Sequence, residues 1–271
     1  MKKLQIMQIR GMCVLILFLA FWLLGCLGCD SGQDVDFFGD MEAQLTEFMV
    51  EELAVDPAVG NVVTDGGEVT VQWYRADKID RVVFSSIHIK ETGVYEESVF
   101  VYPEEGYEFP VLWTNLTQMS GMYILVVDFI PLQDIVMKKD YGQRYLAPLK
   151  TAKDNVLGTY DSPGILEGGV LDEVSFENYC SIYVFSPYKT IIMVAPNAID
   201  RLADVLHEYC AAYISLVNES EMLEVGSADR EYAADRLDAM LNLLQECDPG
   251  YKYMVEAFGQ ETTDGIFDVV F

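Results

Sequence analysis

One histidine in this sequence stands where it could transfer protons. His88 lies in a stretch whose alternation predicts a β-strand over residues 81–90, where it shares one face with Phe84, Ser86 and Lys90. Because imidazole titrates close to neutral pH, a histidine in this setting can act as a general acid or base. A structural role, with the ring hydrogen-bonded to its neighbours, is the alternative.

A carboxylate and several aromatic residues form a second group of candidates. Asp248 directly precedes Pro249, a pair that commonly begins a helix as N-cap and first helical residue. Such a capping carboxylate can also face a pocket and donate a proton. Trp113, Phe185 and Tyr188 could stack on a planar ligand, although aromatic residues in strands more often belong to the core.

The hydrophobic pattern predicts the elements that must position these residues. It predicts strands near residues 68–75, 81–90, 97–102, 110–117, 122–130 and 181–195. It predicts helices near 41–53, 135–153, 199–216 and 232–244, and a shorter pair after Asp248. A Gly-rich loop at 158–178 is long enough to border an active site. Strands joined by such short connections pair antiparallel, so we expect one antiparallel sheet with helices on its faces.

A series of short motifs points to a known family. Asp128-Phe-x-Pro-Leu ends one strand, Tyr145-Leu-x-x-Leu lies in the following helix, and Phe185-Ser-Pro-Tyr188, Asp248-Pro-Gly and Phe258-Gly259 come later. In order and spacing these motifs resemble the ferredoxin-dependent bilin reductases and the related red chlorophyll catabolite reductases, over roughly residues 80–271. Those enzymes reduce linear tetrapyrroles. The resemblance implies a three-layer α/β/α sandwich whose tetrapyrrole lies between the sheet and the carboxy-terminal helices.

The resemblance also implies roles for individual residues. Asp248 matches an Asp that donates protons to the bilin in several members. Asn115 stands at the position of a central-strand Asp that many members use as main proton donor, and an amide cannot replace it in that step. Phytochromobilin synthases also pair an amide here with an Asp-Pro acid, so Asn115 is expected to hydrogen-bond a ring carbonyl or pyrrole N–H. His88 completes the predicted catalytic set.

The expected substrate-binding residues follow from the same resemblance and from the aromatic positions. Family members often carry a propionate-binding Arg where Met193 stands. Lys189 shares the strand face of Met193 but lies about 13 Å away, at roughly 3.3 Å per residue. The predicted set comprises Phe84, Ser86, Trp113, Phe185, Tyr188 and Lys189.

The implied function is reduction of a biliverdin-type linear tetrapyrrole by single-electron transfers, with protons supplied by the protein. No bound cofactor or metal is expected, and an external one-electron donor, ferredoxin or an equivalent, would supply the electrons. The alternative is a non-catalytic, membrane-anchored tetrapyrrole-binding protein that kept the pocket and lost the chemistry.

The amino-terminal segment has the layout of a secretory signal. Basic residues up to Arg10 precede an apolar run that ends at Leu24 and is followed by Gly25-Cys26. This resembles a bacterial lipobox and predicts a signal peptide at 1–25, lipidation of Cys26, a tether at 26–39 and the bilin-reductase-like domain at 40–271. The expected location is therefore extracytoplasmic and membrane-anchored. A plain peptide anchor, and plastid targeting in a eukaryote, are the alternatives.

The charge of the chain is strongly negative. The formal net charge is −27, and removal of the signal leaves 14 basic against 44 acidic residues. Such a surface disfavours nucleic acid, and it should also disfavour an acidic ferredoxin. One group of cations could offset this repulsion locally, although a solvated helix face is the alternative: Lys138, Lys139, Arg144, Lys150 and Lys153.

Three cysteines, Cys180, Cys210 and Cys247, lie in the predicted folded domain. Small buried apolar residues are the usual role for such cysteines. Two of them could form a disulfide in an oxidising compartment, and the sequence leaves the pairing open.

Overall fold

A computed structural model describes residues 37–46, 49–119, 122–160, 184–194, 202–248 and 250–271. Eight strands form one sheet in the order β1-β3-β4-β5-β6-β7-β8, with β2 beside β3, and all neighbours pair antiparallel. The strands are β1 (Met49–Leu53), β2 (Asn61–Val63), β3 (Gly67–Ala76), β4 (Ile79–Ile89), β5 (Val94–Pro103), β6 (Val111–Met119), β7 (Met122–Ile130) and β8 (Thr190–Val194).

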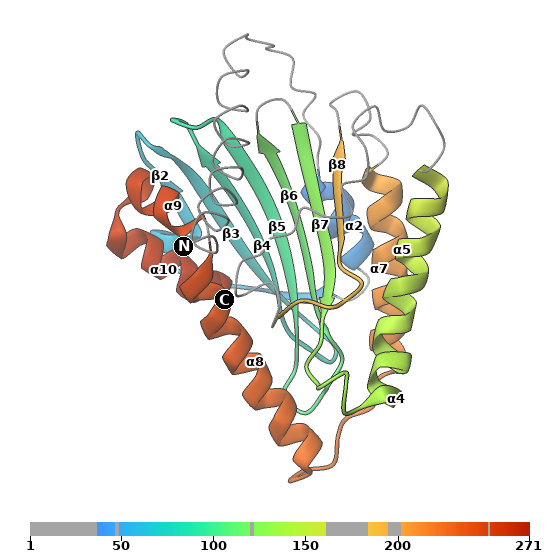
Figure 1. The fold of residues 1–271 in the computed structure, drawn as a ribbon. Coiled ribbons are helices and arrows are strands. Elements are labelled where there is room, and N and C mark those ends of the chain that lie inside the picture. Colours follow the sequence, from blue (N-terminus) through green and yellow to red (C-terminus); the bar gives the residue numbers. More distant parts are fainter. Residues whose placement is uncertain (1–36, 47–48, 120–121, 161–183, 195–201, 249) are drawn as a thin grey trace, which may run out of the picture.

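Helices cover both faces of this sheet, so the molecule has three layers (Figure 1). The helices are α2 (Phe37–Leu45), α3 (Pro57–Gly60), α4 (Lys139–Tyr141), the π-helical η1 (Gly142–Leu146), α5 (Ala147–Tyr160), α7 (Leu202–Glu219), α8 (Ala228–Cys247), α9 (Tyr251–Phe258) and α10 (Gln260–Val270). The predicted α/β/α sandwich with a central antiparallel sheet is confirmed.

Each face of the sheet has its own apolar core. Along β5, Val99 and Val101 pack against α2, α5 and α7, whereas Phe100 and Tyr102 pack toward α8, α9 and α10. We call the first face the α7 face and the second the C-terminal face. Because successive strand residues point to opposite sides, this assignment determines which functional candidates can meet.

The prediction of elements succeeded for the five central strands and failed near the amino-terminal edge. Strands β3 to β7 lie where alternation placed them. The expected helix at 41–53 ends at Leu45, and Met49–Leu53 instead forms β1, which pairs with β3. Strand β2 was not predicted, and β8 is shorter than the expected 181–195. Edge strands such as β1 depend on a partner distant in sequence, which local periodicity cannot reveal.

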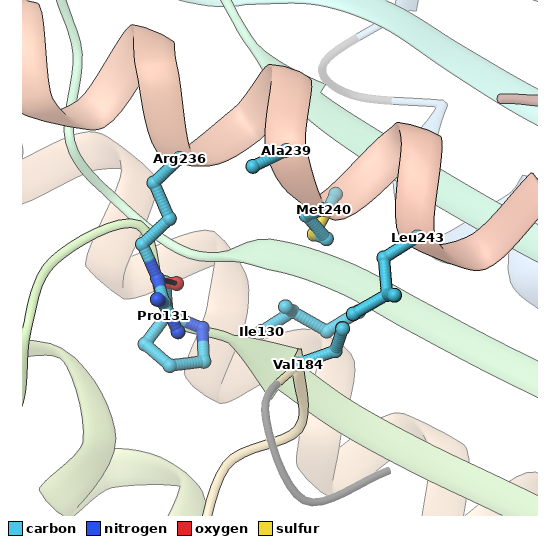
Figure 2. Close-up of a pocket in the computed structure, with 7 residues that line it drawn as sticks. All are labelled: Ile130, Pro131, Val184, Arg236, Ala239, Met240 and Leu243. Atoms are coloured by element: carbon cyan, nitrogen blue, oxygen red, sulfur yellow. Dashed lines mark hydrogen bonds between the residues drawn. The ribbon is translucent and has the colours of Figure 1, made fainter. Parts of the chain in front are cut away.

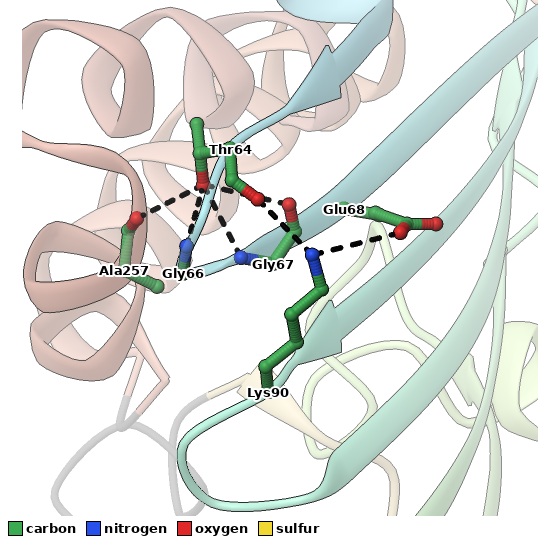
Figure 3. Close-up of polar contacts among 6 residues, drawn as sticks. All are labelled: Thr64, Gly66, Gly67, Glu68, Lys90 and Ala257. Atoms are coloured by element: carbon green, nitrogen blue, oxygen red, sulfur yellow. Dashed lines mark hydrogen bonds and ion pairs between the residues drawn. The ribbon is translucent and has the colours of Figure 1, made fainter.

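A tight turn between β2 and β3 attaches α9 to the sheet (Figure 3). Thr64 Oγ1 accepts hydrogen bonds from the backbone N–H groups of Gly66 and Gly67 and donates to the carbonyl of Ala257, at 3.1, 3.2 and 3.2 Å. Lys90 Nζ donates to the Thr64 carbonyl at 3.2 Å and lies 3.8 Å from Glu68. The turn therefore joins the end of α9 to β3 and β4.

The predicted signal peptide, Cys26 and most of the tether lie outside the described residues. The predicted tether at 26–39 overlaps α2, which begins at Phe37, so its last residues belong to the folded domain. Within the described part of the chain, no helix is long and apolar enough to cross a membrane.

Candidate functional site

A carboxylate that sequence reasoning missed lies on the C-terminal face, near the start of β5. Glu96 is half-buried on β5, on the same side as Phe100. Ser98 Oγ donates a hydrogen bond to Glu96 Oε1 at 3.4 Å, and Asn115 Nδ2 donates to Ser98 Oγ at 2.8 Å. Thr117 Oγ1 in turn donates to Asn115 Oδ1 at 2.9 Å. Asn115 therefore stands in a hydrogen-bonded chain that ends on an acid.

The environment of Glu96 favours its protonated form. Burial raises the pKa of the Glu96 carboxyl from 4.5 to about 7, and the negative charge of Asp248 adds to the rise. Hydrogen bonds from the side chains of Asn115, Ser98 and Thr117 oppose it. A carboxyl that titrates near neutral pH is suited to donate a proton and to be reprotonated from solvent.

Asp248, in the helical layer, is the second acid of the site, beside Glu96. It is the C-cap of α8, and its Oδ1 accepts a hydrogen bond from the backbone N–H of Gly250 at 2.6 Å. Burial raises the pKa of the Asp248 carboxyl, while the N–H groups of Gly250 and Tyr251 oppose the rise. Asp248 thus ends one helix where an N-cap had been expected, and its carboxylate interacts with Glu96 across the gap between helix and sheet.

Beside these acids, aromatic rings form a stacked row on the sheet. Trp113 lies between Phe100 and Phe185, with ring centroids 6.0 and 5.0 Å away and interplanar angles of 12° and 14°. Phe100 also stacks on Tyr102 at 5.7 Å. Lys189 Nζ lies 5.1 Å from the Phe185 ring centroid. Trp113 is two residues from Asn115 on the same strand face, so the row adjoins the acid cluster.

Asp128 holds the end of the aromatic row in place. It lies on β7 opposite Trp113 and is fully buried. Its carboxylate accepts hydrogen bonds from the backbone N–H of Ser186 at 2.8 Å, from the Ser186 hydroxyl at 2.5 Å and from the Phe129 N–H at 2.9 Å. Ser186 follows Phe185 directly, so this contact fixes Phe185 against Trp113. The two motifs that contain Asp128 and Ser186 are thereby joined in space.

The structure does not bring all predicted site residues together. Asn115, Asp248, Trp113, Phe185 and Lys189 are associated with the C-terminal face. The other four lie toward the α7 face. Phe84 belongs to the core of that face, and Ser86 and His88 follow it at every second residue of β4, so they point to the same side. Tyr188 packs against the same core.

His88 has its own polar surroundings on the α7 face. Its ring is 6.3 Å from that of Tyr95 in an edge-to-face arrangement. The Tyr95 hydroxyl accepts from Ser86 Oγ at 3.4 Å and donates to Glu97. A pocket on the C-terminal face therefore does not include His88, Ser86 or Phe84, because the sheet separates them from Asp248. The shared face of these β4 residues was predicted correctly, whereas the side on which it lies depends on helix packing.

Glu96 could have been found from one signal in the sequence. Glu96 and Glu97 are consecutive inside a strand, so one carboxylate must point to each face. Only the pairing of β5 with β6, which sets Ser98 opposite Asn115, shows that Glu96 is the one beside Asn115.

The remaining charged and cysteine candidates have structural partners. Lys138 pairs with Asp229, Lys150 pairs with Asp154, and Arg144 donates to the carbonyl of Glu219. Cys210 is buried, and burial raises the pKa of its thiol to about 12. Cys247 is disulfide-bonded. The described residues contain no group of side chains suited to hold a metal ion.

Several solved structures are similar to this chain. Phytochromobilin synthase from tomato, solved in complex with biliverdin, superposes with a TM-score of 0.68 and 19% sequence identity, covering 85% of this chain and 79% of that chain. The chain has the fold of this bilin reductase. The resemblance inferred from the short motifs is thus confirmed at the level of the fold. The sequence matches no family model and no curated protein.

Proposed function

We propose that this protein binds a linear tetrapyrrole of the biliverdin type between the sheet and helices α8 to α10, and reduces it in single-electron steps. Glu96 and Asp248 supply the protons, and Asn115 orients a polar edge of the ligand. The observation that carries the proposal is the coupled pair Glu96 and Asp248, set beside the stacked row of Phe100, Trp113 and Phe185. The structural neighbour, which was solved with biliverdin, supports the ligand class.

The chemistry of the site suits a substrate that is reduced stepwise. Each two-electron reduction consumes two electrons from an external donor and two protons. A carboxyl with a pKa near 7 and a second acid whose pKa is also raised can deliver those protons in turn. Aromatic rings offer a stacking surface for the conjugated pyrroles. The Glu96 carboxyl supplies the acid that Asn115 cannot.

A non-catalytic tetrapyrrole-binding protein is the second candidate. Asn115 favours it, because an amide replaces the acid that many bilin reductases use on the central strand. Lys138 and Lys150 form ion pairs with Asp229 and Asp154, and these pairs reduce the positive charge that could attract an acidic ferredoxin. We therefore propose an external low-potential one-electron donor without assigning it to ferredoxin, and the membrane anchor through Cys26 remains a prediction.

The test begins with binding. Titration with biliverdin should shift the long-wavelength bilin band and quench tryptophan fluorescence, with one ligand bound per chain. Absence of both changes at tens of micromolar biliverdin would refute the proposed ligand class.

Turnover then separates the two candidates. With a low-potential donor, the wild type should reduce the bound bilin, and Asp248→Asn should bind it equally but stall at an unreduced or radical state. A wild type that binds biliverdin and never reduces it would establish the binding-protein alternative. A D248N variant with wild-type turnover would limit Asp248 to its role as helix cap.

A further inference from the structure

A covalent cross-link lies directly beside one acid of the site. Cys247 is the last residue of α8 and is disulfide-bonded, and Asp248 follows it as the C-cap of the helix. Cys210, on α7, is by contrast a free and buried thiol. The disulfide therefore restrains the backbone one residue away from a carboxylate that interacts with Glu96.

The end of α8 is an unfavourable place for a carboxylate. A helix carries partial negative charge at its carboxy-terminal end, which repels an anion there and favours a cation. The last turn of α8 contains no basic residue that could offset this repulsion. Glu96 adds a second repulsion from the sheet, because the two carboxyl groups interact electrostatically. Both effects favour movement of the Asp248 carboxylate away from Glu96.

The hydrogen bonds of Asp248 are local to the junction between α8 and α9. Its N–H donates to the Leu244 carbonyl at 3.0 Å, its carboxylate accepts from the Gly250 N–H at 2.6 Å, and its carbonyl accepts from the Tyr251 N–H at 3.3 Å. These partners all lie within four positions of Asp248 along the chain. The three bonds fix the shape of the junction, but they would move with it.

The packing of α8 against the sheet also leaves its end weakly restrained (Figure 2). The fully buried residue of α8 nearest to Cys247 is Met240, about two helical turns earlier. A cavity of about 150 Å³ lies between α8 and the end of β7, where Met240 and Leu243 of the helix line the same space as Ile130 and Val184. A helix over incompletely filled space has fewer contacts that oppose its movement.

We infer that the Cys247 disulfide is the restraint that keeps Asp248 beside Glu96. Cys247 is thus a positioning residue, because it acts through the neighbouring acid. The inference rests on the proposed function, in which Asp248 and Glu96 supply the protons. It also makes the acid pair dependent on the thiol–disulfide state of the protein, since reduction of the bond would release the end of α8.

The first experiment follows the titration of the Glu96 carboxyl by carbon-13 NMR, without any ligand. Cys247→Ser should shift the Glu96 pKa from about 7 toward its ordinary value of 4.5, in the same direction as Asp248→Asn and by a similar amount. Cys210→Ala, which removes a thiol that forms no disulfide, is the matched control and should leave the titration unchanged. The other side chains that interact with Glu96 are uncharged: Ser98, Asn115 and Thr117.

A double-mutant cycle separates positioning from general loosening of the fold. In the Asp248→Asn background the repelling charge is already absent, so Cys247→Ser should shift the Glu96 pKa no further. A further shift in that background would mean that loss of the disulfide exposes Glu96 to solvent, and it would overturn the positioning role. An unchanged Glu96 pKa in Cys247→Ser alone would overturn it as well.

Reduction of the folded wild type gives the same comparison without a substitution. Dithiothreitol breaks the S–S bond by supplying two electrons and two protons, which leaves two thiols and converts the reagent to its cyclic disulfide. The reduced protein should show the Glu96 titration of Cys247→Ser. If the reduced protein and the variant both unfold, the disulfide serves the whole fold and the positioning role is refuted.

Turnover separates this inference from the proposed function. With bound biliverdin and a low-potential donor, Cys247→Ser should slow a single turnover by about 10²-fold because the acid is misplaced, while biliverdin binding is unchanged. Titration shifts as expected, in a protein that does not bind biliverdin, would uphold the restraint on Asp248 and refute the proposed function. Bilin reduction by the wild type, with neither rate nor Glu96 titration altered in Cys247→Ser, would refute the inference alone.

Discussion

The two faces of the sheet carry similar polar residues and use them differently. On the C-terminal face, Glu96 interacts with a second acid, Asp248, and its pKa is raised to about 7. On the α7 face, one residue further along the strand, Glu97 is buried and accepts a hydrogen bond from the Tyr95 hydroxyl. On this sheet an acid becomes a proton-donor candidate where burial raises its pKa and a second acid faces it from the helical layer.

The helical layers are also attached in different ways. Lys78 holds α7 at its carboxy-terminal end, where its ammonium donates to the carbonyls of Val217, Asn218 and Ser220. The α9 layer is held by backbone approach at Gly66, where an added Cβ would lie 2.3 Å from the Ala257 carbonyl oxygen. The α9 attachment therefore depends on the absence of a side chain, whereas the α7 attachment depends on the presence of one.

The largest expected effect tests the two neighbouring glutamates. Glu96→Gln should lower bilin turnover by about 10²–10⁴-fold, because it removes a positioned proton donor. Glu97→Gln, the matched change on the opposite face, should leave turnover within a few-fold of wild type. Single-turnover kinetics with biliverdin and a low-potential donor measures both. Equal losses in the two variants would contradict the assignment of the site to the C-terminal face.

Glu96 should also make the stability of the protein depend on pH. The folded-state pKa of Glu96 is raised from 4.5 to about 7, so its contribution to stability is fully present below pH 4.5 and is lost as pH rises through 7. Over that range the unfolding free energy should fall by up to about 3 kcal/mol because of Glu96. Glu96→Gln should show a shallower decline than the wild type, as measured by urea denaturation at pH 4.5 and 8.

Asp128 also contributes to the pH dependence of the unfolding free energy. Burial raises the pKa of its carboxyl to about 7, while hydrogen bonds from Ser186 and Phe129 oppose the rise. A residual decline with pH should therefore persist in Glu96→Gln. A decline as steep as in the wild type would show that Glu96 does not titrate in this range.

The smallest expected effect tests how the helical layers attach. An added Cβ at Gly66 would lie 2.3 Å from the carbonyl oxygen of Ala257 in α9, so Gly66→Ala should cost about 1–3 kcal/mol of unfolding free energy. Gly142→Ala, in η1 on the opposite layer, is the control, because nothing lies within 4 Å of its added Cβ. It should be neutral or stabilising by up to about 1 kcal/mol. Thermal or chemical unfolding of both variants decides the comparison, and a neutral Gly66→Ala would contradict the close approach of α9 to the turn.

Much of the fold was predictable from local pattern, and the exceptions have a common cause. Strands β3 to β7 are neighbours in both sequence and space, so alternation and short connections were sufficient to place them. Strand β1 was predicted as the end of a helix, because Met49 and Leu53 also fit helical spacing. Its pairing with residues 73–76 of β3 overrides that preference.

The site was predictable only in part. Motifs pointed to Asn115, Asp248, Trp113 and Phe185, which share the C-terminal face. Strand alternation and residue type also pointed to His88, which lies on the α7 face. Glu96 carries no motif, and its role depends on the register that places Ser98 opposite Asn115.

Residue types and their spacing along the chain were enough to predict the strand and helix periodicities and the negative charge. They were also enough to predict which residues of one strand share a face. These properties are local, because they follow from residue type and spacing along the backbone. The tertiary structure alone decided which helical layer covers each strand face, and hence which acid meets Asp248. That choice depends on packing between segments more than 100 residues apart, where the burial and mutual repulsion of two carboxylates first arise.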